Sequence, residues 1–312
     1  MPYNEIICKD ADAFWDYLDP RNPLGRGLDN SEQFIFRGQI DAQNWNLVPS
    51  SHRKETNPSF LIENENNPTA DIQIYNEWSI LKSFVEQCDM TGIKVPRETH
   101  SDRSKLFEEY NFINEYMNKP ANWPGEEYYE ILAFAQHHGL PTCLLDWTKR
   151  SHIAAYFASS QAIIKKENFE NLVVWALDIS IFSTDIVERI ELPTSISKNL
   201  SAQFGMFTLL RQDMELGHIF SPNFLEDTVS EQFLTRLSLN KKYAAKILKY
   251  CDLYAVSAAT LFPGVDGAVK ATKEKVAIDR KTEGYKSILS DQQKEEQKLS
   301  VTMWRGDDRI DN

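Results

Sequence analysis

The chain has 312 residues, of which 42% are hydrophobic, 26% charged and 12% aromatic. This composition is that of a folded protein with a sizeable core, and it excludes a disulfide-held miniature scaffold and disorder over the whole length. The 46 acidic and 34 basic residues give a formal net charge of -12. Because proteins that neutralise many phosphates are basic, broad nucleic-acid binding is not expected.

The cysteines favour a reducing compartment, and the apolar segments are too short to predict a membrane span. Cys8, Cys88, Cys143 and Cys251 lie far apart and form no Cys-x-x-Cys pair, so they predict buried thiols rather than a zinc ribbon or a redox motif. No signal-like segment opens the chain, and no stretch approaches the roughly 18 uninterrupted apolar residues of a membrane span. We therefore expect a cytoplasmic protein without a membrane segment.

Several segments repeat their apolar residues at helical spacing. The first predicted helix follows a cap at Asp10 or Asp12. The predicted helices cover residues 10–18, 72–88, 104–117, 125–138, 151–164 and 241–250, and a closing helix follows residues 261–267.

Shorter β-prone segments lie between these helices. Phe34-Ile35-Phe36 predicts a strand that Gly38 ends, with Arg37 projecting from the strand end. A nearly continuous apolar run is typical of a central strand buried on both faces. The predicted strands cover residues 33–38, 172–179, 203–209 and 253–256, the second of these being the apolar run.

Strands separated by several helices, without strict βαβ alternation, predict an α+β fold: a single domain with a mixed sheet and helical insertions. Residues 20–30 are turn-rich and predict a linker, and residues 55–71 are polar and predict a surface loop. After Lys273 the apolar period fades into charged residues. We therefore expect one domain over residues 1–272 and a polar tail, helical or disordered, over residues 273–312.

The first candidate site is Phe36-Arg37-Gly38-Gln39. A strand-end arginine suits phosphate or carboxylate because guanidinium is a planar bidentate donor, and a following glycine lets backbone approach the anion. The alternative is that Arg37 pairs with an acid such as Asp146 and ties two elements together.

The second candidate runs from Gln136 to Thr148. The adjacent His137 and His138 point to different sides of a helix, so they cannot share one metal ion, and we expect no metal site. His138 is expected at a helix C-terminus. Asp146 and Thr148 precede a helix, where they could cap it or form the wall of an active site.

Two weaker candidates come later in the chain. Gln203 precedes Gly205, and Asp266 stands between two glycines, where a turn residue is the alternative. No GxGxxG, P-loop, GxSxG or HExxH motif is present, so the usual nucleotide-loop, hydrolase and zincin signatures are missing.

Taken in order, these motifs resemble the FRG domain family, which is named after its Phe-Arg-Gly sequence. The resemblance covers roughly residues 5–272 and departs from the family pattern at Cys143, where arginine is frequent. It implies a fold more firmly than a reaction, and it associates the chain with bacterial or phage conflict systems, including phage defence. The motifs that carry it are Phe36-Arg37-Gly38-Gln39, Gln136 to Thr148 with Ala154 to Ala158, Gln203 to Phe207, and Leu261 to Gly267.

A more distant resemblance is to ADP-ribosyltransferases of the arginine-serine-glutamate type. Arg37-Gly38 would match their first motif, Asp146-Trp147-Thr148 the second, and Gln203 would fall near the third. The resemblance implies NAD as the substrate, with no metal, and the catalytic residues Arg37, Asp146, Thr148 and Gln203. It also implies contacts of NAD with Arg37, Gly38, Gln39, His138 and Thr148.

The chemistry of NAD cleavage gives these residue types a reason. The bond breaks through an oxocarbenium-like centre, so the site needs a cation for the pyrophosphate, a hydroxyl for ribose and an anion near the developing charge. Arg37 could clamp phosphate, Thr148 could hold ribose and Asp146 could orient either. Gln203 would replace an acid with an amide that lacks the full charge.

Two other interpretations stay open. The same cleft could hold a nucleotide or a protein segment without turnover, as a binding module. Alternatively the motifs could be fold determinants, with Arg37 bonded to Asp146, Trp147 in the core, and Gly139 and Gly264 as helix caps. A buried Arg37–Asp146 pair away from any pocket would favour the structural interpretation, and an open cleft lined by Arg37, Thr148 and Gln203 would favour a binding or catalytic one.

Overall fold

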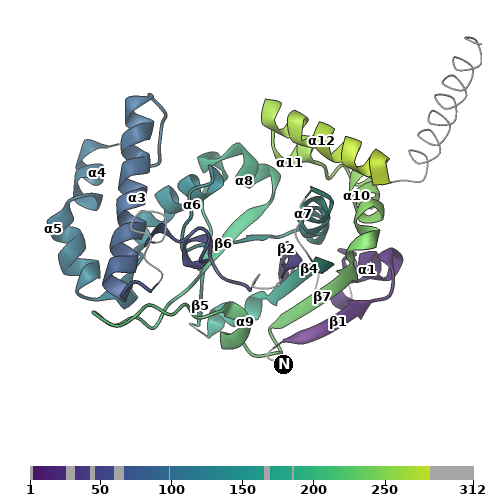
Figure 1. Ribbon diagram of the computed structural model, residues 1–312, viewed down its shortest axis with the longest axis horizontal. Helices are drawn as coiled ribbons and strands as arrows, with labels where there is room; N and C mark the ends of the chain where they lie inside the picture. The colour runs from purple at the N-terminus through teal and green to yellow at the C-terminus, as the bar shows by residue number, and fades with distance from the viewer. Residues whose placement is uncertain are drawn as a thin grey trace, which may run out of the picture.

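A computed structural model describes residues 3–25, 32–42, 46–59, 67–97, 99–164, 169–184 and 186–281 (Figure 1). Parts of three predicted segments lie outside these residues: 26–30 of the linker, 60–66 of the surface loop and 282–312 of the tail.

A seven-stranded mixed sheet lies at the centre of the described chain, in the order β1-β7-β4-β2-β3-β6-β5. β1 and β7 are parallel, and every other neighbouring pair is antiparallel. The predicted α+β single domain with a mixed sheet is confirmed. The strands are β1 (Asn4–Cys8), β2 (Phe34–Ala42), β3 (Leu145–Thr148), β4 (Phe169–Asp178), β5 (Val187–Ile190), β6 (Gly205–Leu210) and β7 (Leu234–Asn240).

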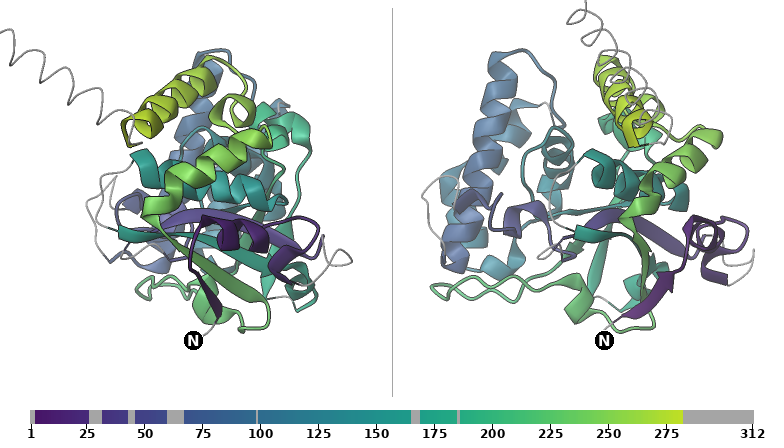
Figure 2. Two further views of the ribbon diagram at one scale, coloured as in Figure 1. Left: turned by 90° about the vertical axis from the view of Figure 1, so that its right-hand side faces the viewer. Right: turned by 45° about the vertical axis from the view of Figure 1, so that its right-hand side comes forward.

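Helices cover the sheet in two groups. One group packs near β1 and β7, and the other, containing α3 to α5, stands at the opposite side of the molecule (Figures 1 and 2). The helices are α1 (Ala11–Tyr17), α3 (Ala70–Met90), α4 (His100–Leu106), α5 (Glu109–Phe112), α6 (Tyr129–His137), α7 (Ser151–Ile164), α8 (Lys198–Ala202), α9 (Leu225–Thr228), α10 (Ala244–Leu253), α11 (Ala258–Leu261) and α12 (Val265–Lys281).

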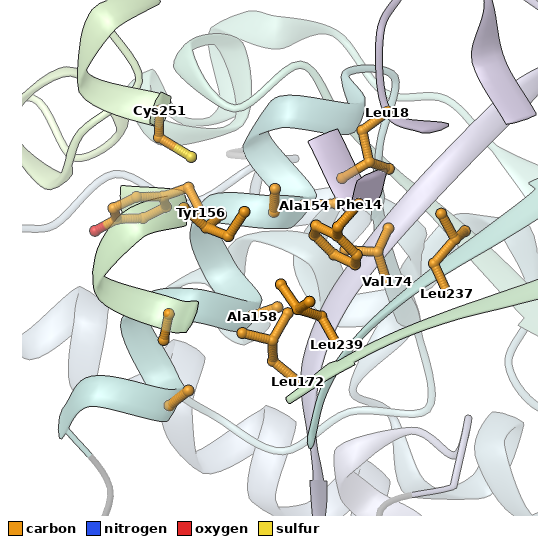
Figure 3. Close-up of a cluster of buried hydrophobic side chains, with 14 of the residues drawn as sticks. Phe14, Leu18, Ala154, Tyr156, Ala158, Leu172, Val174, Leu237, Leu239 and Cys251 are labelled. Carbon is orange, nitrogen blue, oxygen red and sulfur yellow. The ribbon is translucent and has the colours of Figure 1, made fainter. Parts of the chain in front are cut away.

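β4 shows how the sequence pattern produces the layers. Its even-numbered residues from Leu172 to Ala176 pack under α1, α7 and α10, whereas Val173, Trp175 and Leu177 enter a second core on the other face. Figure 3 shows the first of these cores, with Val174 beside Phe14 of α1 and Leu172 beside Leu239 of β7. Burial on both faces explains the continuous apolar run, and the prediction of a central strand is confirmed.

Different helices cover the strands on the two sides of β3. α7 packs on β2, and a third core joins α3 and α6 to Phe207 and Leu209 of β6. β3 lies between these two covered regions. Within the described residues β2 and β3 pair at one position, Phe36 with Thr148.

Gly38 lies inside β2 and does not end it, which corrects the prediction of a strand end at Arg37. The strand continues to Ala42, and Arg37 stands opposite Trp175 of β4. A Cβ atom at Gly38 would lie 1.8 Å from the carbonyl oxygen of Ala154. The glycine is therefore required by the close approach of α7 to the strand.

Most predicted helices are confirmed, and the differences have local causes. The segment predicted as one helix over 104–117 divides into the end of α4, the short α5 and a π-helical turn over Ile113–Met117. The predicted strand over 253–256 is wrong: Leu253 ends α10, and Ala255 has a φ of 57°, which turns the chain towards α11. Within 203–209 the strand begins at Gly205, since Phe204 also has a positive φ, 48°.

The polar loop predicted over 55–71 is partly buried. Asn57 and Ser59 are buried, and Ser59 Oγ donates a hydrogen bond to Gln73 Oε1 of α3 at 3.1 Å. Polar composition alone therefore does not place this segment at the surface, because its polar atoms find partners inside.

α12 crosses the predicted boundary at Lys273. The Glu274 carboxylate is buried and accepts hydrogen bonds from Tyr156 at 2.7 Å and Ser160 at 2.5 Å, both on α7. Asp266 lies in the first turn of α12 rather than in an isolated turn. The division at residue 272 stays a prediction, since α12 packs against the core of the domain as far as Ile278.

The four cysteines are free and buried, as predicted. No helix among the described residues is both long and apolar enough to cross a bilayer.

His152 gives the fold a specific dependence on pH. Its ring stacks on Trp15 with centroids 4.2 Å apart, and burial lowers its pKa to about 4, against the opposing effect of Asp19. A histidine whose pKa is lower in the folded state stabilises the fold fully above about pH 6.5 and loses that contribution as the pH falls towards 4. We expect His152→Phe, which keeps a stacking ring, to remove about 2–3 kcal/mol of the stability loss between pH 7 and pH 4 in urea titrations.

His218→Phe is the matched control, because the His218 side chain is 71% exposed. Its stability should follow the same pH curve as the wild type. Parallel curves for His152→Phe and the wild type would show that His152 is not the titrating group.

Candidate functional site

A cleft of about 260 Å³ opens over β3, between α6 and α7. Strands β2, β3 and β6 contribute to it, together with α8 and the residues that follow α8 and α11. Its polar lining residues are Arg37, Gln136, His137, Asp146, Thr148, Gln161 and Gln203, and its apolar walls include Phe157, Leu200, Phe207 and Phe262.

Arg37 reaches across the divergence of β2 and β3. Its Nη1 donates to the Asp146 carbonyl oxygen at 2.7 Å and lies 3.4 Å from the Asp146 carboxylate. The Arg37 side chain is 16% exposed, and its Nε is buried without a hydrogen-bond partner. Arg37 therefore contacts Asp146, as the alternative interpretation expected, and it also lines an open cleft.

Asp146 is held by a short hydrogen-bond relay. The Thr142 hydroxyl donates to Gln136 Oε1, and Gln136 Nε2 donates to the Asp146 carboxylate. Ser50 Oγ holds Thr142 in place, because it accepts a hydrogen bond from the Thr142 backbone amide at 3.0 Å. The Asp146 side chain is nevertheless 56% exposed, so its charge stays available in the cleft.

Thr148 and Gln203 lie at the cleft wall, but their polar atoms bind backbone. The Thr148 hydroxyl donates to the Gln203 carbonyl oxygen at 2.7 Å and accepts from the Arg150 amide at 3.1 Å, just before α7. Gln203 Nε2 donates to the Leu261 carbonyl oxygen at 3.1 Å. These bonds fasten the end of β3 to α8 and α11.

The two neighbouring histidines separate, as expected. His138 is exposed, ends α6 and does not line the cleft, whereas His137 does. Burial, together with the nearby His138, lowers the pKa of His137, which keeps its ring neutral at pH 7. Gln39 is buried at 3% exposure in the middle of β2 and is not among the lining residues, whereas Gly38 is.

Three buried polar atoms without hydrogen-bond partners belong to residues of this one cleft. They are Arg37 Nε, His137 Nε2 and Gln161 Oε1. An unsatisfied buried donor or acceptor costs about 1–3 kcal/mol, and most such groups in folded proteins are paired. Three residues that line the cleft therefore each keep one buried polar atom without a partner.

Aromatic side chains form the opposite wall. Phe157 of α7 and Phe262, which follows α11, meet edge to face with centroids 6.2 Å apart. Lys270 of α12 places its ammonium 3.9 Å from the centre of the Phe262 ring. A planar ring could lie against this wall, since aromatic side chains provide stacking surface.

Asp146 supplies the carboxylate of the cleft among the described lining residues. Glu188 accepts from Tyr129 and pairs with Arg211 at 2.8 Å, and Glu191 pairs with Lys149 at 2.6 Å, both outside the cleft lining. Within the described ranges no group of three or more histidine, cysteine or acidic side chains is arranged to hold a metal ion.

The mixed sheet and its helix-walled polar cleft define an α+β domain with a preformed cavity. Residues 32–167 match the family model of the FRG domain, so this part of the chain is an FRG domain. The matched region is shorter than the expected 5–272 and runs from β2 through α7, so it contains Arg37, Gln136, Asp146 and Gln161 but not Gln203. No curated protein and no solved structure matches the chain.

Proposed function

We propose that the cleft binds a nucleotide, with NAD as the substrate, and that the protein cleaves the bond between nicotinamide and ribose. The observation that carries the proposal is that Arg37, His137 and Gln161, each with a buried polar atom that lacks a hydrogen-bond partner, line one cleft. NAD offers complementary groups: phosphate oxygens for the guanidinium and a carboxamide that both donates and accepts.

The roles follow from the chemistry of each side chain. Arg37 Nε would donate to a pyrophosphate oxygen. Gln161 Oε1 would accept from the nicotinamide NH₂, and His137 would meet a second polar group of the ligand. Phe157 and Phe262 would cover a ring face.

Asp146 would supply the negative charge. When the C1′–N1 bond breaks, its electron pair leaves with nicotinamide, which becomes neutral, and positive charge develops on the ribose. A fixed carboxylate lowers the free energy of that centre, provided that it lies close to it. Water or an acceptor then adds to C1′ and releases a proton to solvent.

Binding without turnover is the second candidate function. It is favoured by the bonds of Thr148 and Gln203, whose side chains hold backbone and leave one carboxylate to act. The protein would then sense a nucleotide or hold a protein segment in a bacterial or phage conflict system. The cytoplasm suits either role, because the four unpaired cysteines favour a reducing compartment.

The test follows free nicotinamide during incubation of the full chain with NAD, together with calorimetric titration of NAD. We expect nicotinamide release by the wild type and at least a tenfold loss of affinity in Arg37→Ala, since a charge-assisted contact is worth about 1.5–3 kcal/mol. Arg21→Ala is the control, because the Arg21 side chain is 84% exposed and pairs only with Asp19 in the described chain.

The outcomes separate the two functions. Binding without nicotinamide release would favour the sensing module and contradict the reaction. The absence of both NAD binding and nicotinamide release would contradict NAD as the ligand.

A further inference from the structure

A second cavity, of about 400 Å³, adjoins the cleft on the other side of Arg37. Arg37, Gln136 and Asp146 line both spaces, so these side chains form a shared partition. The second cavity is bounded by the turn that follows β2 and by the loop between α6 and β3, with Arg53 and Leu140 among its walls.

Arg53 is the feature that gives this cavity a chemical character. Its Nε and Nη2 donate to the Val48 carbonyl oxygen at 3.1 and 3.0 Å, which orients the guanidinium plane. Burial and the neighbouring charge of Arg37 lower the pKa of Arg53 to about 10, so the Arg53 guanidinium stays charged at pH 7. Arg37 and Arg53 line the same cavity, and their like charges repel, so an anion between them would relieve the repulsion.

We infer that the cleft and this cavity together form one dinucleotide site, in which a pyrophosphate spans Arg37 and Arg53. The inference rests on the proposed function and extends it to the substrate class. The nicotinamide half would occupy the cleft with the aromatic wall, and the adenosine half would occupy the cavity beyond Arg37. The partition residues would then contact the middle of the ligand.

The charges around the partition favour a pyrophosphate diester over a free phosphate. Asp146 is already compensated by Gln136 and Arg37, and Glu55 stands exposed at the cavity. Arg37 and Arg53 therefore share the cavity with two carboxylates, each of which has a smaller effect on the pKa of Arg53 than the repulsion from Arg37. A terminal phosphate monoester, which carries more charge on one group, gains less from this surrounding than a diester whose charge is spread over two phosphorus centres.

The test is calorimetric titration of the full chain with ADP-ribose, AMP and nicotinamide mononucleotide. We expect ADP-ribose to bind at least tenfold more tightly than either mononucleotide. Arg53→Gln should remove most of that advantage, while the affinity for nicotinamide mononucleotide stays unchanged. Arg21→Gln serves as the matched control.

Arg53 also holds the Val48 carbonyl, so a second variant guards against a loss of local structure. Glu55→Gln removes an exposed carboxylate and should tighten ADP-ribose binding about two- to threefold. Equal affinities for ADP-ribose and AMP, or no effect of either variant on ADP-ribose, would overturn the dinucleotide site.

These results are separable from the proposed reaction. Tight ADP-ribose binding that depends on Arg53, without nicotinamide release from NAD, supports the site and contradicts the reaction. Nicotinamide release that is indifferent to Arg53, with equal affinities for ADP-ribose and AMP, supports the reaction and contradicts the site.

Discussion

Replacing Gly38 by alanine should destabilise the protein by about 3 kcal/mol or more, which places it among the largest effects of a single substitution. The added Cβ would lie 1.8 Å from the Ala154 carbonyl oxygen and 2.8 Å from the Ala158 amide nitrogen. Both atoms belong to the backbone of α7, and Ala154 and Ala158 are fully buried. Since α10 packs on the same helix, α7 cannot withdraw without opening the core. Urea unfolding monitored by tryptophan fluorescence measures the loss.

Two controls separate a clash from a general glycine effect. Gly217→Ala places a Cβ in open space at a φ of +76°, so it should cost only about 1–2 kcal/mol. Ala154→Gly should not rescue Gly38→Ala, because the clash is with backbone. If Gly38→Ala unfolded at the same urea concentration as the wild type, or if Ala154→Gly restored its stability, Gly38 would not be required by the close approach of α7 to β2.

The Gly38 position shows where sequence reasoning about the motif falls short. A glycine after an arginine suggested room for an anion, and it was expected to end the strand. The close contact with α7 comes from a residue more than a hundred positions later in the chain. No local sequence pattern predicts the distance between residue 38 and the backbone of α7, because this distance depends on how the helix lies on the sheet.

Strands were predicted where burial leaves a pattern. β4 is buried on both faces and was expected, whereas β1 and β5 form the two edges of the sheet and were missed. β1 has one buried residue in five, and Ile7 is 78% exposed, so neither alternation nor a continuous apolar run marks it. β7 was also missed, although its residues from Leu234 to Leu239 are mostly buried, because polar residues interrupt its apolar run.

The motifs predicted which segments form the cleft but not every side chain that lines it. Arg37 and Asp146 were expected, and they meet at the divergence of two strands. Gln136 and His137 stood in the second candidate segment without an assigned role, and Gln161 was not predicted, since the rotation of α6 and α7 over the sheet decides which of their residues face the cleft. The pairing of Gln136 with Thr142 across a helix end was the signal within the motif that could have indicated the relay.

The substitution Asp146→Asn should reduce the rate of nicotinamide release from NAD at least 100-fold. A loss of about this order follows when one electrostatic contact to a charged transition state is removed. Asparagine keeps the shape of the side chain, so an oxygen remains to accept from Gln136. The shorter bond of Arg37, at 2.7 Å, goes to the Asp146 backbone carbonyl and survives the change. The fold should therefore be kept, and the free energy of unfolding of Asp146→Asn should lie within about 0.5 kcal/mol of the wild-type value.

Binding and turnover should respond in opposite directions. Without the Asp146 charge, Arg37 loses its compensation, so the affinity for ADP-ribose should stay equal or rise. Asp213→Asn, at an exposed position outside the cleft lining, is the matched control and should leave both quantities unchanged. If Asp146→Asn retained the wild-type rate, another group would have to supply the anion. If its ADP-ribose affinity fell in parallel with the rate, Asp146 would act by holding the ligand and not by stabilising the positive charge that develops during cleavage.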